Sequence, residues 1–183
     1  MNVYDFDKTI YDGDSSIHFY KYCLKRFPHI IKYWPRQLKA ATQYKRGKIT
    51  KKEMKTVFYT YFQGIPDIFQ VVEDFWEVHE KNIKTWYLEQ KRDDDLIISA
   101  SPEFLLKPIC DKLDINLIAS VVDPYTGENL KENCYGPEKV GRMKEQYNME
   151  EMEAFYSDSY SDDPLAQYAK KSYMVKGNER LPW

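Results

Sequence analysis

Apolar residues cluster along the chain in short runs that have the length of buried β-strands. Strands are expected where such a run is bounded by turn-forming or charged residues, as in Asn2–Phe6, Leu96–Ser99, Ile115–Val122, Ala154–Tyr156 and Tyr173–Val175. A short returning strand, Leu130–Cys134, is predicted after the turn-forming residues Asp123–Gly127. We expect Tyr173–Val175 to be the last strand of the chain.

Residues 15–90, between the first two predicted strands, have a helical pattern. Large side chains recur there at offsets of three and four residues, as on the packed face of a helix: Phe69, Val72, Trp76, His79, Ile83 and Trp86. Thr50 and Glu53 have the spacing of a capping box. Prolines and glycines interrupt the pattern at Pro28, Pro35, Gly47, Gly64 and Pro66. Three or four helices with short connections are therefore predicted.

Strands that alternate with helices are typical of a largely parallel sheet covered by helices on both faces. We therefore predict an α/β fold with a Rossmann-like, mostly parallel sheet. Because the helical stretch leaves the first strand and returns before the second, it is expected to form a small, inserted, all-helical cap. The predicted domains are a discontinuous core, residues 1–13 and 92–183, and a cap, residues 14–91.

Composition limits the classes of protein to which the chain can belong. The chain has 183 residues, of which 43% are apolar and 31% are charged, and this suits one core domain with an insertion. No run approaches the roughly 18 uncharged apolar residues of a membrane helix. The first residues have neither a basic start nor a long apolar run, so a cytoplasmic location is expected. Cys23, Cys110 and Cys134 lie far apart, which argues against a disulfide framework and a zinc cluster.

Charge is unevenly distributed along the chain. The formal net charge of -2 gives no overall attraction to nucleic acid, and no nucleic-acid partner is expected. Basic residues nevertheless dominate the segment from Lys21 to Lys55, in which Glu53 is the only acid. This segment is either a solvated helical face or a surface that steers an anionic substrate or contacts an anionic surface.

Two carboxylates stand two residues apart in the run DFDKT, Asp5–Thr9, where the first predicted strand opens into a loop. Neighbouring carboxylates repel, so at least one must be protonated, paired with a cation or bound to a metal ion. Mg²⁺ takes oxygen ligands and keeps several waters. Asp5, the main-chain carbonyl of Asp7, and Asp158 at the end of another predicted strand are candidates to hold it. Mg²⁺ is therefore the expected cofactor.

Residues at the predicted strand ends have the chemistry needed to cleave a phosphate ester. Asp5 is the candidate nucleophile, since a carboxylate can form a covalent acyl phosphate. Asp7, beside other carboxylates, is the candidate general acid and base. Ser99 and the main-chain donors at the start of the next helix are candidates to bind the phosphoryl oxygens, and Lys139 would add positive charge. Ser101 is expected to cap that helix.

The order of these motifs resembles the haloacid dehalogenase-like superfamily, in the phosphoserine-phosphatase-like branch whose helical cap lies between the first and second motifs. Four segments carry the resemblance over nearly the whole chain: DFDKT, IISASPEFLL (residues 97–106), CYGPEKV (residues 134–140) and YSDSYSDDP (residues 156–164). The resemblance implies phosphate contacts from Thr9, Ser99, Ala100 and Lys139, and metal contacts from Asp5, Asp7, Asp158 and Asp162.

Three positions refine the resemblance. Asp7 is typical of phosphatases and phosphotransferases, whereas dehalogenases and metal-pump ATPases of the superfamily lack an acid there, so hydrolysis of carbon–chlorine bonds is disfavoured. Ser157 departs from the pattern, since many relatives have glycine before the metal-binding aspartate. Asp14 matches the acid that binds the substrate amine in phosphoserine phosphatases, and it is equally expected as the N-cap of the first helix.

The sequence therefore predicts a Mg²⁺-dependent phosphatase that hydrolyses a phosphate monoester through an aspartyl phosphate on Asp5. A phosphotransferase with the same intermediate and a catalytically silent phosphate-binding scaffold are the alternatives. The expected partner is a small phosphorylated metabolite or a phospholipid head group, and no transmembrane segment is expected. Sequence alone fixes neither the substrate nor the oligomeric state.

Overall fold

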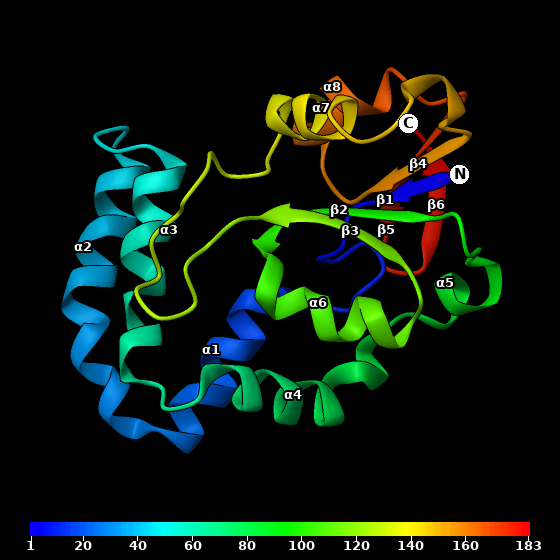
Figure 1. Cartoon of the computed structure of the whole chain (residues 1–183). Coiled ribbons are helices and arrows are strands. Elements are labelled where there is room, and N and C mark those ends of the chain that lie inside the picture. The colour runs from blue at the N-terminus through cyan, green and yellow to red at the C-terminus, as the bar shows by residue number, and fades with distance from the viewer.

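The computed structural model describes residues 1–183 and contains a six-stranded sheet (Figure 1). The strands are β1 (Asn2–Tyr4), β2 (Leu96–Pro102), β3 (Asn116–Ser120), β4 (Ala154–Ser157), β5 (Lys171–Lys176) and β6 (Glu179–Pro182). They lie in the order β3-β2-β1-β4-β5-β6. All neighbouring strands are parallel except β5 and β6, which are antiparallel. The prediction of an α/β fold with a mostly parallel sheet is confirmed.

Alternate side chains of the central strands enter two hydrophobic cores, one on each face of the sheet. The larger core contains Tyr4, Ile97 and Tyr156, and the smaller core contains their neighbours Val3, Leu96 and Phe155. Helix α6 (Glu103–Lys112) packs on the first face, and α7 (Pro137–Lys144) and α8 (Asp163–Ala166) pack on the second (Figure 1). Burial on both faces explains why these strands are short, nearly continuous apolar runs.

Five α-helices lie between β1 and β2: α1 (Ser15–Arg26), α2 (Trp34–Lys45), α3 (Lys51–Tyr59), α4 (Ile68–His79) and α5 (Thr85–Gln90). The capping box of Thr50 and Glu53 is confirmed at the start of α3. The prediction of three or four helices is too low, because a 3-10 turn at Glu80–Asn82 separates α5 without a proline or glycine to announce it. None of the helices combines the length and the apolar character needed to cross a lipid bilayer.

Two strand predictions are wrong. Residues 130–134 form no returning strand, because a single bridge between Val122 and Asn129 is the only pairing after the turn. The strand at Tyr173–Val175 is not the last one. Gly177, with a left-handed φ of 59°, and Asn178 turn the chain back into β6. All residues of β6 are exposed, so this edge strand lacks the apolar pattern that marks the others.

Candidate active site

Parallel pairing brings the carboxyl ends of β1 and β4 together at one edge of the sheet. Tyr4 pairs with Tyr156, and the next residue, Asp5, donates its main-chain N–H to the Tyr156 carbonyl over 2.8 Å. Asp158 follows the last residue of β4, and β2 carries residues 99–101 on the other side of β1. The strand-end residues singled out from the sequence therefore lie around one edge, where parallel sheets bind ligands.

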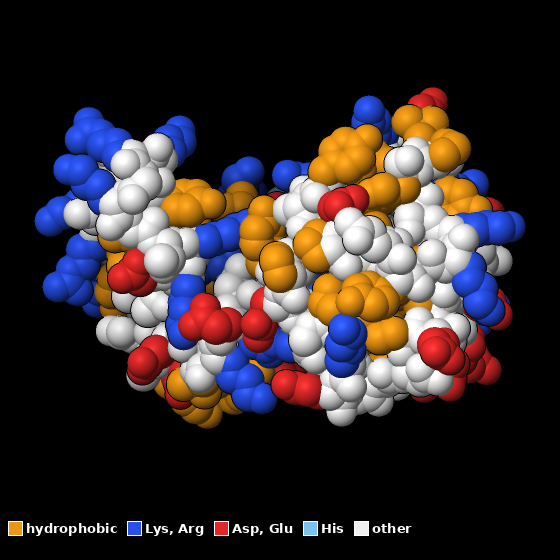
Figure 2. Space-filling model, turned by 90° about the horizontal axis from the view of Figure 1, so that it is seen from above, with side chains coloured by type: hydrophobic (Ala, Val, Ile, Leu, Met, Phe, Trp, Pro, Cys, Tyr) orange, Lys and Arg blue, Asp and Glu red, His pale blue; other side chains and the backbone are white.

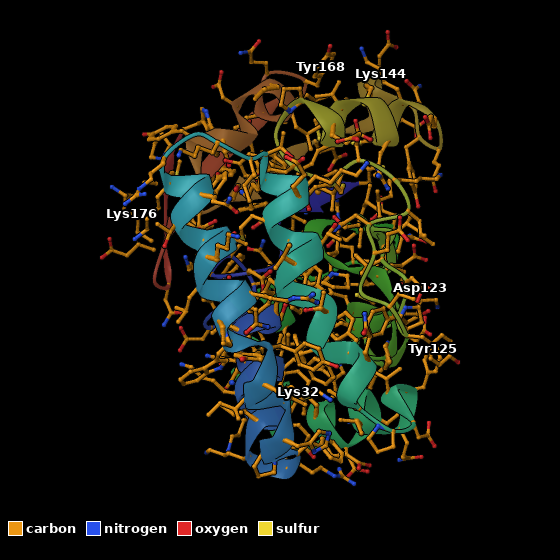
Figure 3. The ribbon with its side chains drawn as sticks, turned by 90° about the vertical axis from the view of Figure 1, so that its left-hand side faces the viewer. Lys32, Asp123, Tyr125, Lys144, Tyr168 and Lys176 are labelled. Atoms are coloured by element: carbon orange, nitrogen blue, oxygen red, sulfur yellow. The ribbon has the colours of Figure 1, made fainter.

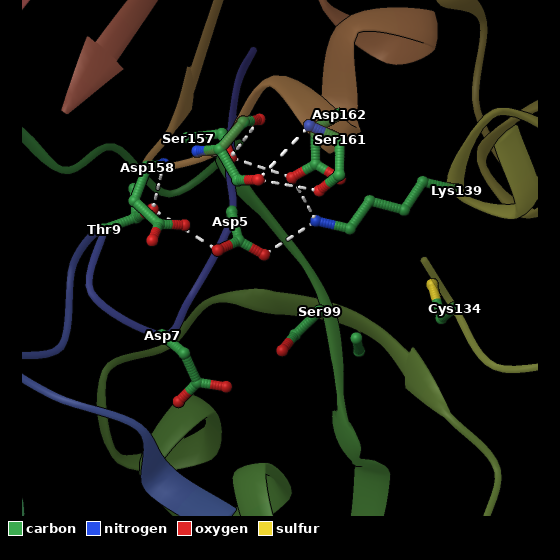
Figure 4. A network of polar contacts seen from close by, with 12 residues as sticks. Asp5, Asp7, Thr9, Ser99, Cys134, Lys139, Ser157, Asp158, Ser161 and Asp162 are labelled. Carbon is green, nitrogen blue, oxygen red and sulfur yellow. Dashed lines mark hydrogen bonds and ion pairs between the residues drawn. The ribbon is translucent and has the colours of Figure 1, made fainter. Parts of the chain in front are cut away.

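Lys139 reaches from the first turn of α7 to the end of β1 and forms two buried ion pairs there (Figure 4). Its Nζ lies 2.7 Å from Asp5 Oδ1 and 2.7 Å from Asp162 Oδ2, and its side chain is only 2% exposed. Burial by itself lowers the pKa of a lysine, but the charges of Asp5 and Asp162 raise the pKa of Lys139 above its ordinary value. Lys139 is therefore a fixed cation at neutral pH.

Asp5 has a different partner on each carboxylate oxygen. Oδ1 contacts Lys139, and Oδ2 accepts a hydrogen bond from Thr9 Oγ1 over 3.3 Å. The same Thr9 hydroxyl accepts the main-chain N–H of Asp158 over 3.0 Å, so it links the Asp5 carboxylate to the loop after β4 (Figure 4). Burial raises the pKa of Asp5, the ammonium of Lys139 opposes this, and the charge of Asp162 adds to it.

The two acids of the loop after β4 have different surroundings. Asp162 is 2% exposed, and its Oδ2 accepts hydrogen bonds from Lys139 and, over 2.8 Å, from Ser157 Oγ. Its Oδ1 is buried without a partner. Burial also raises the pKa of Asp158. Acidic, histidine and cysteine side chains do not gather in threes that could hold a metal ion by themselves. A cation at this site would therefore need main-chain and water oxygens as well.

Asp7 is held apart from the Lys139 cluster by donors from two other elements. Its Oδ2 accepts a hydrogen bond from Ser101 Oγ of β2 over 2.6 Å, and its Oδ1 accepts the main-chain N–H of Ser15 over 2.6 Å. Burial and the charge of Asp14 raise the pKa of Asp7, although these two hydrogen bonds oppose the rise. The two carboxylates of the DFDKT motif are therefore in separate environments, an ammonium for Asp5 and neutral donors for Asp7.

Both carboxylates line a pocket of about 410 Å³ between the sheet edge and helices α1 and α3. The sheet side contributes Asp5, Asp7, Ala100, Ser101, Lys139, Asp158 and Asp162, and the helical side contributes Asp14, Ser16, Lys51, Met54, Lys55 and Tyr59. A concave site with a few converging polar groups is typical of small-molecule binding.

Of the two serines of β2, Ser101 lines this pocket and Ser99 lies outside its lining. Ser99 is buried, and its Oγ accepts the main-chain N–H of Ser101 over 3.1 Å. In Figure 4 the Ser99 side chain projects from β2 beside the pair of Asp5 and Lys139. The prediction that Ser101 caps the next helix is wrong. Because β2 continues to Pro102, which occupies the N-cap position of α6, Ser101 lies in the irregular end of the strand, where the register with β3 shifts, and its hydroxyl donates to Asp7 instead.

Lys55 and Asp14 bring charge to the pocket from the helical side. Lys55 Nζ donates to the Ala100 carbonyl over 2.6 Å and to Asn133 Oδ1 over 3.1 Å, so α3 is tied to the sheet edge. Burial lowers the pKa of Lys55 to about 8. Asp14 accepts the N–H of Ile17 over 3.0 Å, which confirms that it caps α1, and it also lines the pocket.

The family of the chain follows from comparison with known proteins. A model of haloacid dehalogenase-like hydrolases matches residues 3–167. The chain belongs to this family. No curated protein matches it by sequence. The resemblance drawn from the four motifs is thus confirmed for the family, and the family model covers nearly the whole chain.

Solved structures with this haloacid dehalogenase-like fold have low sequence identity to the chain. A protein of unknown function from Bordetella pertussis Tohama I has a TM-score of 0.78 at 18% identity, covering 95% of this chain and 88% of its own. A phosphoserine phosphohydrolase-like protein from Francisella tularensis has a TM-score of 0.61 at 16% identity, covering 97% of this chain and 88% of its own. A substrate-bound phosphoserine phosphatase has a TM-score of 0.53 at 16% identity, covering 93% of this chain and 82% of its own. At such identities the similarity establishes the fold.

Sequence reasoning missed four residues that organise the site of this hydrolase. Ser15 and Ser101 donate to Asp7, Ser157 donates to Asp162, and Lys55 enters the pocket from α3. Only Ser157 carried a signal, because it replaces the glycine of many relatives. Its hydroxyl makes this departure a second donor to Asp162 beside Lys139.

Proposed function

We propose that the chain is a Mg²⁺-dependent phosphatase that hydrolyses a phosphate monoester through an aspartyl phosphate on Asp5. The observation that supports this most directly is the separation of the two motif carboxylates at one pocket. Asp5 lies against the buried ammonium of Lys139, and Asp7 lies on the neutral donors of Ser101 and Ser15. A nucleophile and a proton carrier need such different surroundings.

In the proposed first half-reaction, a carboxylate oxygen of Asp5 bonds to phosphorus while the bond from phosphorus to the leaving oxygen breaks. The raised pKa of Asp7 favours its protonated form, which gives its proton to that leaving oxygen. Lys139, Ser99 and the main chain of Ala100 are the proposed donors to the phosphoryl oxygens, and Thr9 holds the Asp5 carboxylate in place.

In the proposed second half-reaction, the Asp7 carboxylate removes a proton from water as the water oxygen bonds to phosphorus. The bond between phosphorus and Asp5 then breaks, inorganic phosphate leaves and the Asp5 carboxylate is restored. The hydrogen bonds from Ser101 and Ser15 stabilise the charged form of Asp7 during this step. Burial raises the pKa of Asp7 and the two hydrogen bonds lower it, so that Asp7 can act first as an acid and then as a base.

Asp5, Asp158 and the main-chain carbonyl of Asp7 are the proposed Mg²⁺ ligands. This donor set fits the ion, because Mg²⁺ accepts one or two carboxylates and keeps several waters. The Asp7 carbonyl accepts no main-chain hydrogen bond, and the unpartnered Oδ1 of Asp162 can accept one from an ordered water of the ion's shell. When bound, Mg²⁺ would neutralise charge on the phosphoryl group.

Residues 14–91 are proposed as a cap over a core of residues 1–13 and 92–183. Side chains of α1 and α3 complete the pocket whose catalytic groups come from the sheet edge. Contacts from Lys55 to Ala100 and from Lys52 to Glu132 connect the two parts. Asp14 and Lys55 are therefore the proposed contacts to the part of the substrate beyond its phosphate.

Mg²⁺-dependent release of phosphate from an aryl phosphate tests the proposed function. Removal of divalent ions with EDTA is expected to lower the rate to background, and added Mg²⁺ is expected to restore it, because phosphoryl charge is then neutralised. Asp158→Asn should raise the Mg²⁺ concentration needed for half-maximal rate, whereas Asp163→Asn should not. Full activity in EDTA would contradict the proposal. Transfer of phosphate to an added alcohol in place of release would identify a phosphotransferase.

Asp7→Asn is expected to lower kcat/KM, which covers the steps up to formation of the aspartyl phosphate, by about 10²- to 10⁴-fold for an alkyl phosphate, because its leaving alkoxide needs a proton. The loss should be clearly smaller for 4-nitrophenyl phosphate, whose leaving group departs without one. The kcat/KM values for the two esters measure this difference, since the second half-reaction, in which Asp7 acts as the base, does not enter them. Asp12→Asn, an exposed acid of the same loop, is the matched control. Equal losses of kcat/KM for the two esters would show that Asp7 is not the proton donor to the leaving oxygen.

The preference for an anionic leaving group is expected to fall as the pH rises through about 8, where the pKa of Lys55 lies. Below this pH Lys55 is charged and attracts the substrate, and above it the attraction is lost. The ratio of kcat/KM for 4-carboxyphenyl phosphate over phenyl phosphate should drop about tenfold across this range. Lys55→Met should hold the ratio at its low value at every pH, and Lys55→Arg should keep it high. A ratio that titrates in Lys55→Met would contradict the assignment.

A further inference from the structure

The outer part of the helical region concentrates positive charge without acidic residues. Residues 15–52 contain no Asp or Glu and eleven basic residues: Lys21, Lys25, Arg26, Lys32, Arg36, Lys39, Lys45, Arg46, Lys48, Lys51 and Lys52. Only Arg26 and Lys52 among them form ion pairs. Figure 2 shows Lys and Arg side chains gathered over this end of the molecule, at the left of the view. Lys51 lines the pocket, whereas the other ten lie outside its lining, where the phosphate-binding chemistry does not require their charge.

Large apolar side chains are exposed within the same surface. Of the residues of α2 only Ala40 is buried, whereas Trp34 is 42% and Leu38 is 65% exposed. Trp34 and Leu38 are four residues apart and so lie on one side of the helix. Ile31, just before α2, is 50% exposed. Figure 3 looks onto α2 and α3 in front of the sheet, with Lys32 labelled near the start of α2.

The inner side of α2 is already occupied. Gln37 donates to the Phe58 carbonyl over 2.8 Å and accepts from Tyr20 Oη over 3.0 Å, which fixes α2 against α3 and α1. Ala40 packs on the same inner side. With the inner side of α2 occupied, the exposed parts of Trp34 and Leu38 remain available to a partner outside the chain.

We propose that this basic and apolar face, formed by Ile31, Lys32, Trp34, Leu38, Lys39, Lys45, Arg46 and Lys48, docks onto an anionic membrane surface. Lys and Arg side chains near such a surface are attracted by its anionic lipids. Trp, Leu and Ile side chains lie at the boundary between head groups and acyl chains, as in interfacial helices with a basic polar face. Because the whole chain has a net charge of -2, the rest of the molecule is acidic and is repelled, which orients this face toward the membrane.

Lipid fits the apolar residues of this face better than nucleic acid does. Single-stranded nucleic acid combines phosphate attraction with stacking of bases on aromatic rings. Ile31 and Leu38, the two most exposed of the large apolar side chains of the face, have no aromatic ring. An acyl-chain boundary takes up aliphatic and aromatic side chains alike.

Co-sedimentation of the full chain with lipid vesicles tests the proposal without reference to hydrolysis, so its outcome is independent of the proposed function. Binding is expected to vesicles that contain phosphatidylglycerol and not to phosphatidylcholine alone, and to weaken as salt rises from about 0.1 M to about 0.5 M. Lys39→Gln with Lys45→Gln and Arg46→Gln should weaken binding on the order of a hundredfold, at about fivefold for each charge. Trp34→Ser with Leu38→Ser should weaken it by about tenfold or more.

The matched control removes the same charge from other surfaces. Lys144→Gln with Lys170→Gln and Lys176→Gln replaces three exposed lysines outside the helical region and is expected to bind as the unaltered chain does. Thermal melting of each variant shows that it is folded. The proposal is overturned if anionic vesicles bind no better than neutral ones, or if the control weakens binding as much as the test variant. Tighter binding of an oligonucleotide than of vesicles, unaffected by Trp34→Ser with Leu38→Ser, would make this a nucleic-acid surface instead.

Discussion

Asp5→Asn is expected to lower kcat toward an aryl phosphate by at least about 10⁴-fold with Mg²⁺ present. The amide has nearly the shape of the carboxylate, but it cannot form the acyl phosphate on which both half-reactions depend. Direct attack by water would be the only remaining route. Phosphate release under saturating substrate measures the loss, and full activity in the variant would exclude the aspartyl-phosphate mechanism.

Folding of the Asp5→Asn variant is expected to remain intact, which keeps the result interpretable. Burial raises the pKa of Asp5, so its charged form is less favourable in the folded than in the unfolded state above the unfolded pKa. Removing that charge removes this unfavourable contribution, and Lys139 keeps its pair with Asp162. The melting temperature should therefore equal or exceed that of the unaltered chain. Asp12→Asn, which changes the same charge in the same loop, should keep full activity.

The parts of the fold that could be predicted are those whose burial leaves a pattern in the sequence. The strands β1 to β5 are buried apolar runs, and their positions were predicted to within a few residues. The exposed strand β6 has no such run, because an edge strand needs only the main chain to pair. The break before α5 is likewise made by 3-10 geometry and not by a proline or glycine.

In the site, the place of a residue at the sheet edge could be predicted from the sequence, whereas the direction of its side chain could not. Asp5, Asp7 and Asp158 could be placed at one sheet edge because each follows the end of a parallel strand. The direction of Ser101 could not be placed, since it depends on β2 continuing to Pro102. Lys55 stood among many lysines of one segment, and only the packing of α3 against the sheet edge distinguishes it. Spacing along the chain does not contain this information.

Lys139→Met is expected to have the second of the two largest effects, because it acts on stability and on activity. Met has a similar length but no charge, so Asp5 and Asp162 would face one another without the ammonium that lies 2.7 Å from each. Removing one member of a buried ion pair typically costs about 3–5 kcal/mol of folding free energy. The loss of a donor beside the reacting phosphate should lower kcat by about 10²- to 10³-fold in addition. Urea unfolding and phosphate release measure the two effects.

The pH dependence of this loss follows from the charges left behind. In the unaltered chain the raised pKa of Lys139 means that its stabilisation is fully present below its unfolded pKa, so it is constant through neutral pH. Lys139 opposes the rise that burial causes in the pKa of Asp5, so without it this pKa is higher still, Asp5 takes up a proton on folding, and the stability deficit should shrink as the pH falls from about 8 to about 5.5. Adding Asp162→Asn to Lys139→Met should restore part of the stability and none of the activity. Equal urea unfolding midpoints for the unaltered chain and Lys139→Met at both pH values would contradict this prediction. They would show that the charge of Lys139 does not hold the loops of Asp5 and Asp162 together. Any loss of activity would then come from the lost contact to the phosphate alone.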